Sequence, residues 1–400
     1  MNHSSSNSIV KSKKNTSVLK ARGEIKPADN APIPVLHIIK SLGRGGAEML
    51  LPETLSKHDR TKFEFHYIYF VPWKHQMVSA IEKEGGRVTC IAAKNNLKII
   101  LQARKIAAYI KANNIQLVHC HLPWAGIVGR IAGKIAGVPV VYTEHNKWER
   151  YHKLTYYLNK LSFKSQERVI AVSEDVAGSI KKHHHHKKPV IQVVSNGINV
   201  DKYKSSYESD RDIRKELNIP PAAVVIGIVC VFRKQKRLDV WLEIAKALHE
   251  KCPQTRFIIV GDGPLKDELH QKARSFAMDG YLHFAGLQVE TRPYLQAMNI
   301  FMMSSEFEGL PIALLEAMSM GCMPACTDAG GIRELVKDNE NGIVVPVNNP
   351  MQLVDRLADH VNDTDQMKKF GSAARETVIG SFSMQKMVNE LETIYTEIIN

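Results

Sequence analysis

The chain contains 400 residues, of which 44% are hydrophobic and 24% charged, and its formal net charge is +13. This length allows two domains with full hydrophobic cores, and the composition is ordinary for a soluble globular protein. No uninterrupted apolar run approaches the ~20 residues that a membrane span needs, which argues against a membrane-spanning helix. The positive charge indicates anionic partners, and phosphates, acidic lipid and nucleic acid all qualify.

The N-terminal segment and the cysteines bear on where the protein works. Residues 1–30 are rich in Ser, Asn and Lys and lack an apolar core, so we expect a disordered tail and not a signal peptide. The six cysteines are scattered and mostly flanked by apolar residues, which predicts reduced thiols in a cytoplasmic protein. Cys322 and Cys326 are separated by Met-Pro-Ala with no second Cys or His pair, so we expect no metal site there.

From Val35 onward, short β-branched strands alternate with helical patterns such as residues 97–114. The expected strands are VLHII (35–39), HYIYFV (66–71), RVTCIA (87–92), QLVHCH (116–121), VPVVYTEH (138–145), RVIAVS (168–173) and PVIQVVSNGI (189–198). Fully apolar strands separated by helices predict a parallel sheet covered on both faces.

The polar stretch 199–221 separates this series from a second one. The second set of expected strands lies at 222–232, 255–263, 281–286, 299–305, 322–328 and 341–347. We therefore predict an α/β protein with two doubly wound, Rossmann-like domains, at 31–200 and 201–375, facing each other across a cleft. The helical segment 376–400 is expected to return and brace the first domain. Ligands of such folds bind beyond the carboxyl ends of the strands.

The stretch SSEFEGLPIALLEAMSMG (304–321) places two glutamates around a predicted helix start. Pro311 suits the first helical position, and the run of helix formers from Ile312 to Met320 ends at Gly321. Glu308 precedes this helix, and Glu316 lies about 7.5 Å along its axis from Pro311. A buried carboxylate needs a partner, and free N–H groups at a helix start suit an anion. The segment predicts a site in which the two carboxylates meet a polyhydroxylic or cationic partner and the helix start meets an anion.

Other candidate residues follow strand ends. His119 and His121 end one strand and His145 ends the next, while the loop SLGRGGAEM places Gly43, Gly45 and Gly46 between a strand and a helix. Such glycines permit close approach of a phosphate or sugar, although the motif taken alone favours a tight turn between strand and helix. In the second series, Arg233, Lys236 and Arg237 follow the first strand, where basic residues suit a diphosphate. The run His183–His186 is expected to be a solvated basic surface.

Taken in order, these motifs resemble glycosyltransferase family 4, whose members are retaining enzymes of the GT-B fold. The resemblance runs from about Val35 to the C-terminus. The ordered motifs that carry it are SLGRGGAEM, VHCHLPWAG, GVPVVYTEH, AVSEDV, VSNGINVDKY, KQKRLD, VGDGP, LHFAG, SSEFEGLPIALLEAMSMG, TDAGGIRELV and NGIVVP.

The resemblance implies roles for individual residues. Glu316 would hold the ribose of a nucleotide-sugar donor, Glu308 would lie against the donor sugar, and His121 would lie near the reacting carbon. Two groups would bind the donor diphosphate, namely Gly45 and Gly46 of the first domain and the backbone amides around Leu310, Ile312 and Ala313. Phe284 to Leu287 would lie beside the base. Arg233 and Lys236 would stabilise the leaving group. His119 and His145 are assigned, more loosely, to the acceptor side.

The family also implies a reaction without a metal or a cofactor, with a UDP- or GDP-sugar as co-substrate. Val231 departs from the pattern, because the family usually has an arginine five positions before the lysine. Arg233 could substitute for it. If it does not, one charge-assisted contact is lost and donor affinity falls by about an order of magnitude or more.

The acceptor is expected on the first domain and is a glycan or a lipid-linked sugar. Two segments, beginning at Trp73 and Lys147, mix basic residues with Trp, Tyr, Phe and Leu. They suit docking to an anionic membrane surface on the cytoplasmic side, and equally suit ordinary packed helices. The leading hypothesis is thus a hexosyltransferase of cell-surface polysaccharide, lipopolysaccharide or glycolipid synthesis.

Three alternatives remain. A catalytically impaired family member could act as a partner or binding subunit, and Val231 favours that alternative. A phosphorylase of the same fold would generally need a pyridoxal phosphate lysine, for which no segment matches. A nucleic-acid-binding protein would suit the charge, but no DNA-reading motif is present, so we expect no nucleic acid partner.

Overall fold

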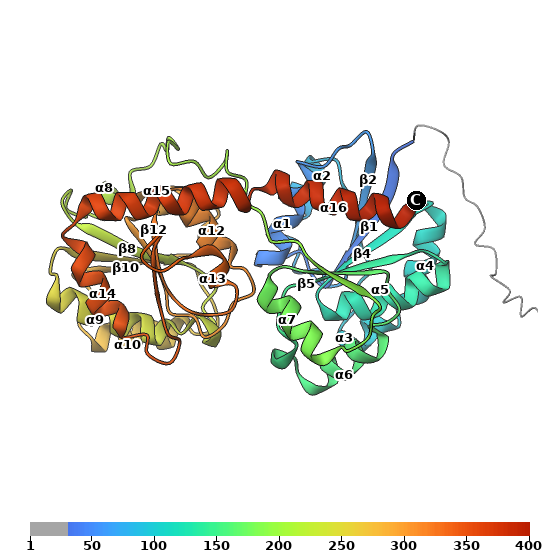
Figure 1. Ribbon diagram of the computed structural model, residues 1–400, viewed down its shortest axis with the longest axis horizontal. Coiled ribbons are helices and arrows are strands. Elements are labelled where there is room, and N and C mark those ends of the chain that lie inside the picture. Colours follow the sequence, from blue (N-terminus) through green and yellow to red (C-terminus); the bar gives the residue numbers. More distant parts are fainter. Residues whose placement is uncertain (1–30) are drawn as a thin grey trace, which may run out of the picture. The chain divides into compact units, whose positions relative to one another are not determined.

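The computed structural model describes residues 31–400, and the N-terminal segment predicted to be a disordered tail lies outside the described residues. Two parallel sheets organise the described chain, and helices cover each of them (Figure 1). This confirms the predicted α/β class with two doubly wound halves.

The first sheet has seven strands in the order β3-β2-β1-β4-β5-β6-β7, and every neighbouring pair is parallel. Its strands are β1 (Ile33–Ile39), β2 (Phe63–Tyr69), β3 (Arg87–Cys90), β4 (Leu117–His121), β5 (Val140–Glu144), β6 (Arg168–Ala171) and β7 (Val190–Val193). The helices of this half are α1 (Gly46–Leu55), α2 (Val78–Lys83), α3 (Asn96–Ile100), α4 (Ala103–Ala112), α5 (Pro123–Ala136), η1 (Trp148–Arg150), α6 (Lys153–Ser162) and α7 (Glu174–His183).

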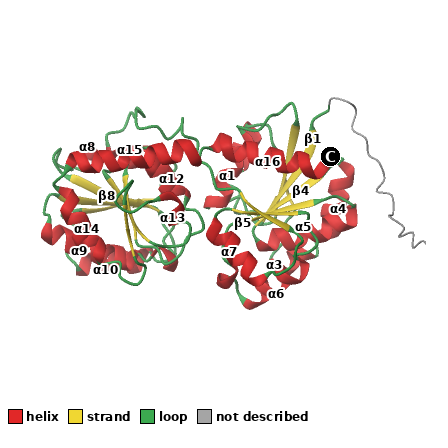
Figure 2. Ribbon diagram, in the orientation of Figure 1, coloured by secondary structure: helices red, strands yellow, loops and turns green. Residues whose placement is uncertain are grey.

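The second sheet has six parallel strands in the order β10-β9-β8-β11-β12-β13. Figure 2 shows helices around its strands. They are β8 (Val224–Val229), β9 (Thr255–Val260), β10 (Leu282–Gly286), β11 (Ile300–Met303), β12 (Met323–Thr327) and β13 (Ile343–Val345). The helices here are α8 (Ile213–Glu216), η2 (Lys234–Lys236), α9 (Leu238–Lys251), α10 (Lys266–Ser275), α11 (Arg292–Ala297), α12 (Ile312–Ser319), α13 (Ile332–Leu335) and α14 (Gln352–Val361).

Every strand overlaps a segment predicted from an apolar run, because a strand buried on both faces reads as a continuous hydrophobic run, but β1 and β2 begin two and three residues earlier than predicted. The helical pattern predicted at 97–114 is confirmed, and the chain forms two helices there, α3 and α4, instead of one continuous helix. Asn95 caps the first by accepting a hydrogen bond from the Lys98 N–H. At the break, the Gln102 side-chain amide donates to the Lys98 carbonyl, which satisfies a group that the interrupted helix leaves open.

The last two helices, α15 (Thr364–Ser381) and α16 (Met384–Ile399), pack on different halves of the chain. α15 contacts α12 and β12, whereas α16 buries Val388, Leu391 and Tyr395 in the core formed with β1 and β2 (Figure 1). Between the two helices, Ile198 pairs with Ser383. The chain therefore passes between the halves twice, at two segments that hydrogen-bond to each other. No helix among residues 31–400 is both long and apolar enough to cross a bilayer.

Candidate active site

Each sheet has a switch point, where the strand order reverses and loops from neighbouring strands diverge. In the first sheet it lies between β1 and β4, and in the second between β8 and β11. The loop after β1 carries Gly45 and Gly46, and β4 ends at His121. The loop after β8 carries Arg233 and Lys236, and the loop after β11 carries Glu308. Ligands of such sheets bind at the carboxyl ends near the switch point, and each sheet holds its own share of the predicted donor residues in the loops at that edge.

Lys236 and Glu308 form an ion pair at the second switch point. The Lys236 Nζ lies 2.7 Å from Glu308 Oε1, and the two side chains are only 16% and 7% exposed. Burial alone would lower the pKa of Lys236, but the neighbouring Glu308 charge acts against it and the pKa is raised. Lys236 is therefore a fixed cation at neutral pH, held in place by a carboxylate.

The start of α12 lies directly after Glu308. Pro311 occupies the N-cap position, one residue earlier than the predicted first helical position, and no side chain caps the helix. The first N–H groups of any helix lack partners within the helix, so those of Ile312 and Ala313 are available to an anion. A Cβ added to Gly46 would lie 3.8 Å from Ile312 Cγ1, so the glycine loop of the first half faces this helix start. The Leu310 carbonyl accepts a hydrogen bond from Asn196 Nδ2 at 3.2 Å.

Glu316 lies within α12 and is buried, at 5% exposure. Burial raises the pKa of its carboxyl to about 7, although a hydrogen bond from the Tyr203 hydroxyl and the charge of Lys202 act in the opposite direction. Hydrogen-bond donors that contact a buried carboxylate favour its ionised form and lower its pKa. Ribose hydroxyls are donors of this kind.

The strand-end histidines divide into two environments. His119 has both ring nitrogens bonded, Nδ1 with the Tyr395 hydroxyl and Nε2 with the Thr143 hydroxyl, each at 2.6 Å. It therefore has no nitrogen left for an acceptor. His121 bonds through Nε2 alone, and the buried Nδ1 has no partner among the described residues. His145 lies beside it, with ring centroids 5.8 Å apart, and burial lowers the pKa of His145 to about 4.

Val231 and Arg233 follow the end of β8. Val231 is half-buried and Arg233 is exposed. The Arg233 charge acts on Lys236 and on Glu48 of α1, so it lies within electrostatic reach of both halves. Arg233 is thus close enough to the Lys236–Glu308 pair to share an anionic ligand with it.

Comparison with known proteins matches both halves of the chain to glycosyltransferases. Residues 44–202 match the family described as Glycosyltransferase Family 4, and residues 209–377 match the family described as Glycosyl transferases group 1. The chain belongs to glycosyltransferase family 4. It is therefore a glycosyltransferase, as the ordered motifs predict.

Individual relatives agree with this assignment. The transferase is 26% identical over 300 residues, covering 72% of this chain and 77% of the relative, to the UDP-Gal:alpha-D-GlcNAc-diphosphoundecaprenol alpha-1,3-galactosyltransferase of Escherichia coli. Among solved structures, Anabaena HepE in complex with UDP and glucose superposes with a TM-score of 0.80 at 21% identity, covering 91% of this chain and 100% of that one. The sucrose-phosphate synthase of Thermosynechococcus elongatus gives 0.74 at 17% identity, covering 91% and 98%. These likenesses confirm the GT-B fold.

The residues predicted to border the base lie on the edge strand β10 and the turn after it. The Phe284 ring stacks on His270 with centroids 4.0 Å apart, and Leu287 is 61% exposed. Gly286 between them has a φ of +67°, which turns the chain sharply at the strand end.

Four residues near the transferase site were not predicted from the sequence: His37, Glu48, Asn196 and Tyr203. Glu48 is half-buried beside the glycine loop and accepts a hydrogen bond from Ser41 at 3.2 Å. Burial raises its pKa, with the backbone, Ser41 and the Arg233 charge acting against it. Glu48 could have been noticed in the sequence, because it is an acidic residue only two positions after the glycine loop. Asn196 lies in the turn after β7 and Tyr203 in the linking stretch 199–221. Both stand in the quoted motif VSNGINVDKY, but no periodicity marks either residue.

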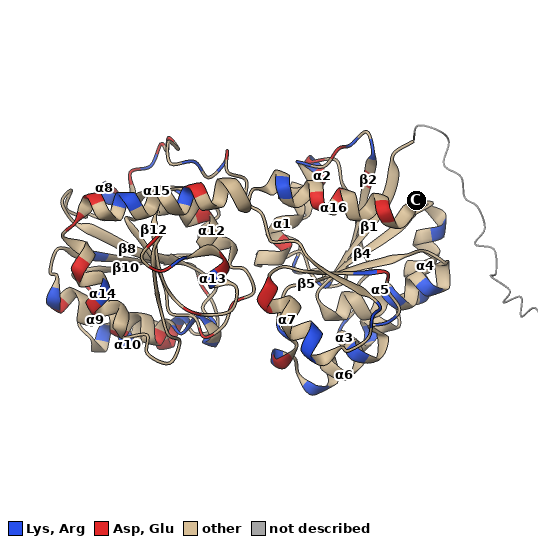
Figure 3. Ribbon diagram, viewed as in Figure 1, with Lys and Arg blue, Asp and Glu red and all other residues tan. Residues whose placement is uncertain are grey.

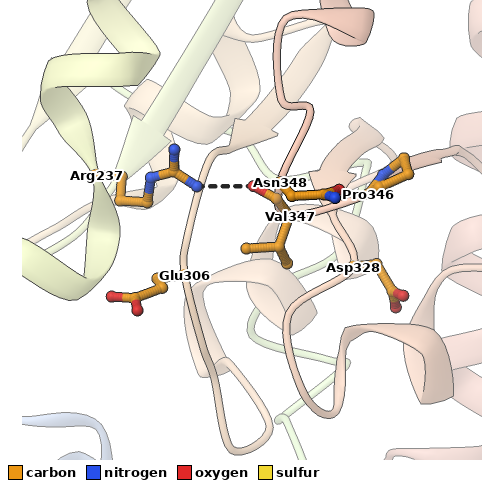
Figure 4. Close-up of a pocket in the computed structure, with 6 residues that line it drawn as sticks. All are labelled: Arg237, Glu306, Asp328, Pro346, Val347 and Asn348. Carbon is orange, nitrogen blue, oxygen red and sulfur yellow. Dashed lines mark hydrogen bonds between the residues drawn. The ribbon is translucent and has the colours of Figure 1, made fainter.

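A cavity of about 680 Å3 in the second half is not lined by Lys236, Glu308 or Glu316 (Figure 4). It is lined by Arg237, Glu306, Asp328, Pro346, Val347 and Asn348. Arg237 donates to the Val347 carbonyl at 2.8 Å across it. The cavity neighbours the donor site along the chain, because Arg237 and Glu306 lie next to Lys236 and Glu308.

Within residues 31–400, one set of side chains has the spacing of metal ligands. His37, His119 and His121 each offer one nitrogen, and these atoms lie within 4.8 Å of one another. However, both His119 nitrogens are occupied by hydroxyl groups, and His37 and His121 already bond to each other. The three rings therefore form a packed hydrogen-bonded cluster instead of three free ligands. The run His183–His186 at the end of α7 does not share this spacing.

Proposed function

We propose that this glycosyltransferase moves a sugar from a UDP-sugar to a glycan or lipid-linked acceptor in cell-surface polysaccharide, lipopolysaccharide or glycolipid synthesis. UDP is preferred over GDP because the HepE complexes contain UDP and glucose and because the Escherichia coli relative is named for UDP-Gal. The names of further relatives refer to lipopolysaccharide core synthesis in Rhizobium meliloti and to Vi polysaccharide synthesis in Salmonella typhi.

One observation carries the proposal: a buried cation, held by Glu308, lies beside an uncapped helix start that faces a glycine loop. A diphosphate at this point would meet Lys236, the free N–H groups of α12 and the backbone of Gly46. Glu316, further along α12, would then accept hydrogen bonds from the ribose. These are the contacts that a nucleoside diphosphate needs.

The proposed transfer is retaining and uses no metal. The bond from the sugar's anomeric carbon to the diphosphate oxygen breaks, and its electron pair leaves with the diphosphate. A new bond forms on the same face from the anomeric carbon to an acceptor oxygen, whose proton passes to the leaving phosphate. Lys236, Arg233 and the α12 N-terminus stabilise the charge that develops on the diphosphate. Glu308 and His121 lie on the sugar side.

The first test is thermal shift against UDP, GDP and their sugars, repeated on Glu316→Ala. Ligand binding to the folded state raises stability by about 2.7 kcal/mol at a hundredfold excess over the dissociation constant. We expect a shift with UDP compounds that the variant loses. Transfer should persist in EDTA, and the product should keep the anomeric configuration of the donor. An inverted product or EDTA inhibition would refute the proposed chemistry.

The alternative of an impaired partner subunit depends on Val231. If Arg233 supplies the missing cation, Arg233→Ala should weaken UDP binding by about an order of magnitude. No shift with any nucleotide, together with no effect of Arg233→Ala, would favour the impaired subunit.

The acceptor side of the first half carries a groove of about 430 Å3 beyond the carboxyl ends of β3, β4 and β5. It is lined by Asn95, Asn96, Leu97, Trp124, His152, Leu154 and Thr155. Trp124 comes three residues after His121, so the groove begins close to the proposed reaction centre. We assign it to the acceptor.

An exposed apolar surface surrounds this groove, formed by Leu97 of α3 and by Leu154, Tyr157 and Leu161 of α6, which are 58%, 47%, 66% and 84% exposed. The two stretches that contain it, 85–143 and 150–166, contain lysines and arginines but no acidic residue (Figure 3). Exposed apolar side chains among lysines favour an anionic bilayer, so we propose that the enzyme binds peripherally to the inner face of the membrane.

Co-sedimentation with phosphatidylcholine vesicles, with and without phosphatidylglycerol, tests this membrane contact. We expect binding only with phosphatidylglycerol, weakened by salt, and reduced in the double variant Leu154→Ser/Leu161→Ser. The matched control is Val289→Ser/Ile379→Ser, which removes two exposed apolar side chains elsewhere. Equal loss in both variants, or no binding by the wild type, would refute the contact.

A further inference from the structure

His37 lies in β1, next to the strand that ends at His121, and its side chain touches that of His121. In the sheet register His37 pairs with His119, and Ile39 pairs with His121, so His37 and His121 are diagonal neighbours on one face. His37 Nδ1 lies 2.9 Å from His121 Nε2. The two rings are nearly parallel, with centroids 5.2 Å apart and an interplanar angle of 12°. Both side chains are buried, at 2% and 6% exposure.

This hydrogen bond contains one proton between two neutral rings. Burial, together with the neighbouring His119, holds the pKa of both His37 and His121 well below the usual value, so neither ring is charged at neutral pH. The remaining nitrogens, His37 Nε2 and His121 Nδ1, have no partner among the described residues. Each neutral ring has one N–H, so either His37 Nδ1–H donates to His121, or His121 Nε2–H donates to His37.

The surroundings of His37 favour the first arrangement. Its ring stacks on Tyr67 at 5.0 Å and contacts Phe65 at 5.6 Å, so a proton on His37 Nε2 would be an unpaired donor among aromatic rings. Buried N–H groups without a partner are rare because losing their hydration is unfavourable. With the proton on His37 Nδ1, the unpaired donor is instead His121 Nδ1–H, at the end of β4 beside the proposed donor sugar.

We propose that His37 is a positioning residue, which accounts for the presence of a histidine inside β1. It holds the ring of His121 in place and keeps the His121 proton on Nδ1, so that His121 acts as a hydrogen-bond donor to the bound sugar. This inference rests on the proposed function where it places His121 beside the donor sugar. His119 does not take this role, because its nitrogens hold Thr143 and Tyr395.

Two substitutions of His37 distinguish its role in orienting the His121 ring from its role in packing. In His37→Asn, the side-chain amide can donate from near the position of Nδ1, whereas His37→Leu fills the space without a donor. The matched control is His66→Leu, because His66 is equally buried in the neighbouring strand but pairs in register with Leu36 and bonds to Tyr109. It therefore lies on the opposite face of the sheet.

Release of UDP from UDP-glucose and UDP-galactose gives the kinetic readout. Partners that orient a functional histidine typically contribute about 10- to 100-fold. We expect His37→Leu to lower kcat by a factor in this range with KM for the UDP-sugar within about twofold. His37→Asn should recover most of kcat, and His66→Leu should leave it unchanged. Equal kcat in His37→Leu and the wild type, or equal loss in His37→Leu and His37→Asn, would overturn the inference.

Nitrogen-15 NMR of histidine-labelled full-length protein reads the tautomer without any turnover. The His121 signals, identified by their absence in His121→Gln, should show the Nδ1-protonated form in the wild type and a mixture in His37→Leu. An Nε2-protonated His121 in the wild type would overturn the inference even if His37→Leu failed to fold. Full UDP release by His121→Gln would instead refute the proposed role of His121 and leave the tautomer result intact.

Discussion

At the scale of single residues, the site depends on charges that the fold buries in pairs. Glu308 is 6% exposed, and its partner Lys236 neutralises it at 2.7 Å. Removing one member of a buried pair leaves an uncompensated charge, which destabilises far more than loss of a surface pair. The pair therefore contributes to the folded state as well as to the proposed binding of diphosphate.

Lys236→Ala should reduce both stability and transfer. Breaking a buried pair costs about 3–5 kcal/mol of unfolding free energy, which urea denaturation measures. The double variant Lys236→Met/Glu308→Gln carries no buried charge, so it should recover stability but not UDP release. Lys251→Ala, which breaks the exposed pair with Asp355, is the control and should change neither quantity appreciably. A Lys236→Ala protein as stable as the control would contradict this account.

At the scale of elements, the C-terminal helix α16 is fastened to the strand that ends at His121. Tyr395 of α16 is fully buried and bonds to His119, and the Glu392 carboxylate accepts from the Asp59 N–H at 2.8 Å. The last helix thus contributes polar contacts beneath the switch point of the first sheet. The sequence predicts that the helix returns to this half, but neither contact could be predicted from it.

Tyr395→Phe tests this attachment because it removes one oxygen and keeps the ring. The His119 Nδ1 would then be buried without a partner, which costs about 1–3 kcal/mol. We expect a lower urea midpoint with an unchanged denaturant slope. Tyr157→Phe, at an exposed position, should leave the midpoint where it is. A midpoint unchanged in Tyr395→Phe would show that the hydroxyl does not hold the helix.

At the scale of the whole molecule, buried ionisable groups link stability to pH in two directions. Burial lowers the pKa of His119 to about 3 and that of His145 to about 4, and those of His37 and His121 are lowered well below normal. Below about pH 6.5 these histidines bind protons in the unfolded chain but not in the folded protein. The free energy of unfolding therefore decreases as the pH falls through this range. Burial raises the pKa of Glu144 and Glu316 to about 7, which has the opposite effect between about pH 4.5 and 7.

Among these six groups four histidines oppose two glutamates, so we expect stability to fall between pH 6.5 and 4.5 and to fall about twice as steeply just below pH 4.5. Each histidine contributes a slope of about 1.4 kcal/mol per pH unit. His119→Gln should therefore reduce the slope of unfolding free energy against pH by about that amount. This holds even if the substitution also changes stability at pH 7.5. Urea unfolding at pH 7.5, 6.5, 5.5, 4.5 and 4.0 measures the slopes. An unchanged slope would mean that His119 is protonated in the folded protein.

The sequence alone predicted where the strands lie, that they are parallel, and the family, because apolar runs and short motifs are local properties of the chain. The order of the strands in each sheet came from the structure. It also predicted Glu308, Glu316 and Lys236 as neighbours of one helix start, since sheet topology gathers strand-end loops at one edge. Only the tertiary structure decided which hydrogen-bond partners His119 and His121 have. His119 and His121 have the same alternation and the same neighbours in sequence, yet one bonds to α16 and the other to β1. That difference arises from contacts 276 and 84 residues apart, which no local pattern encodes.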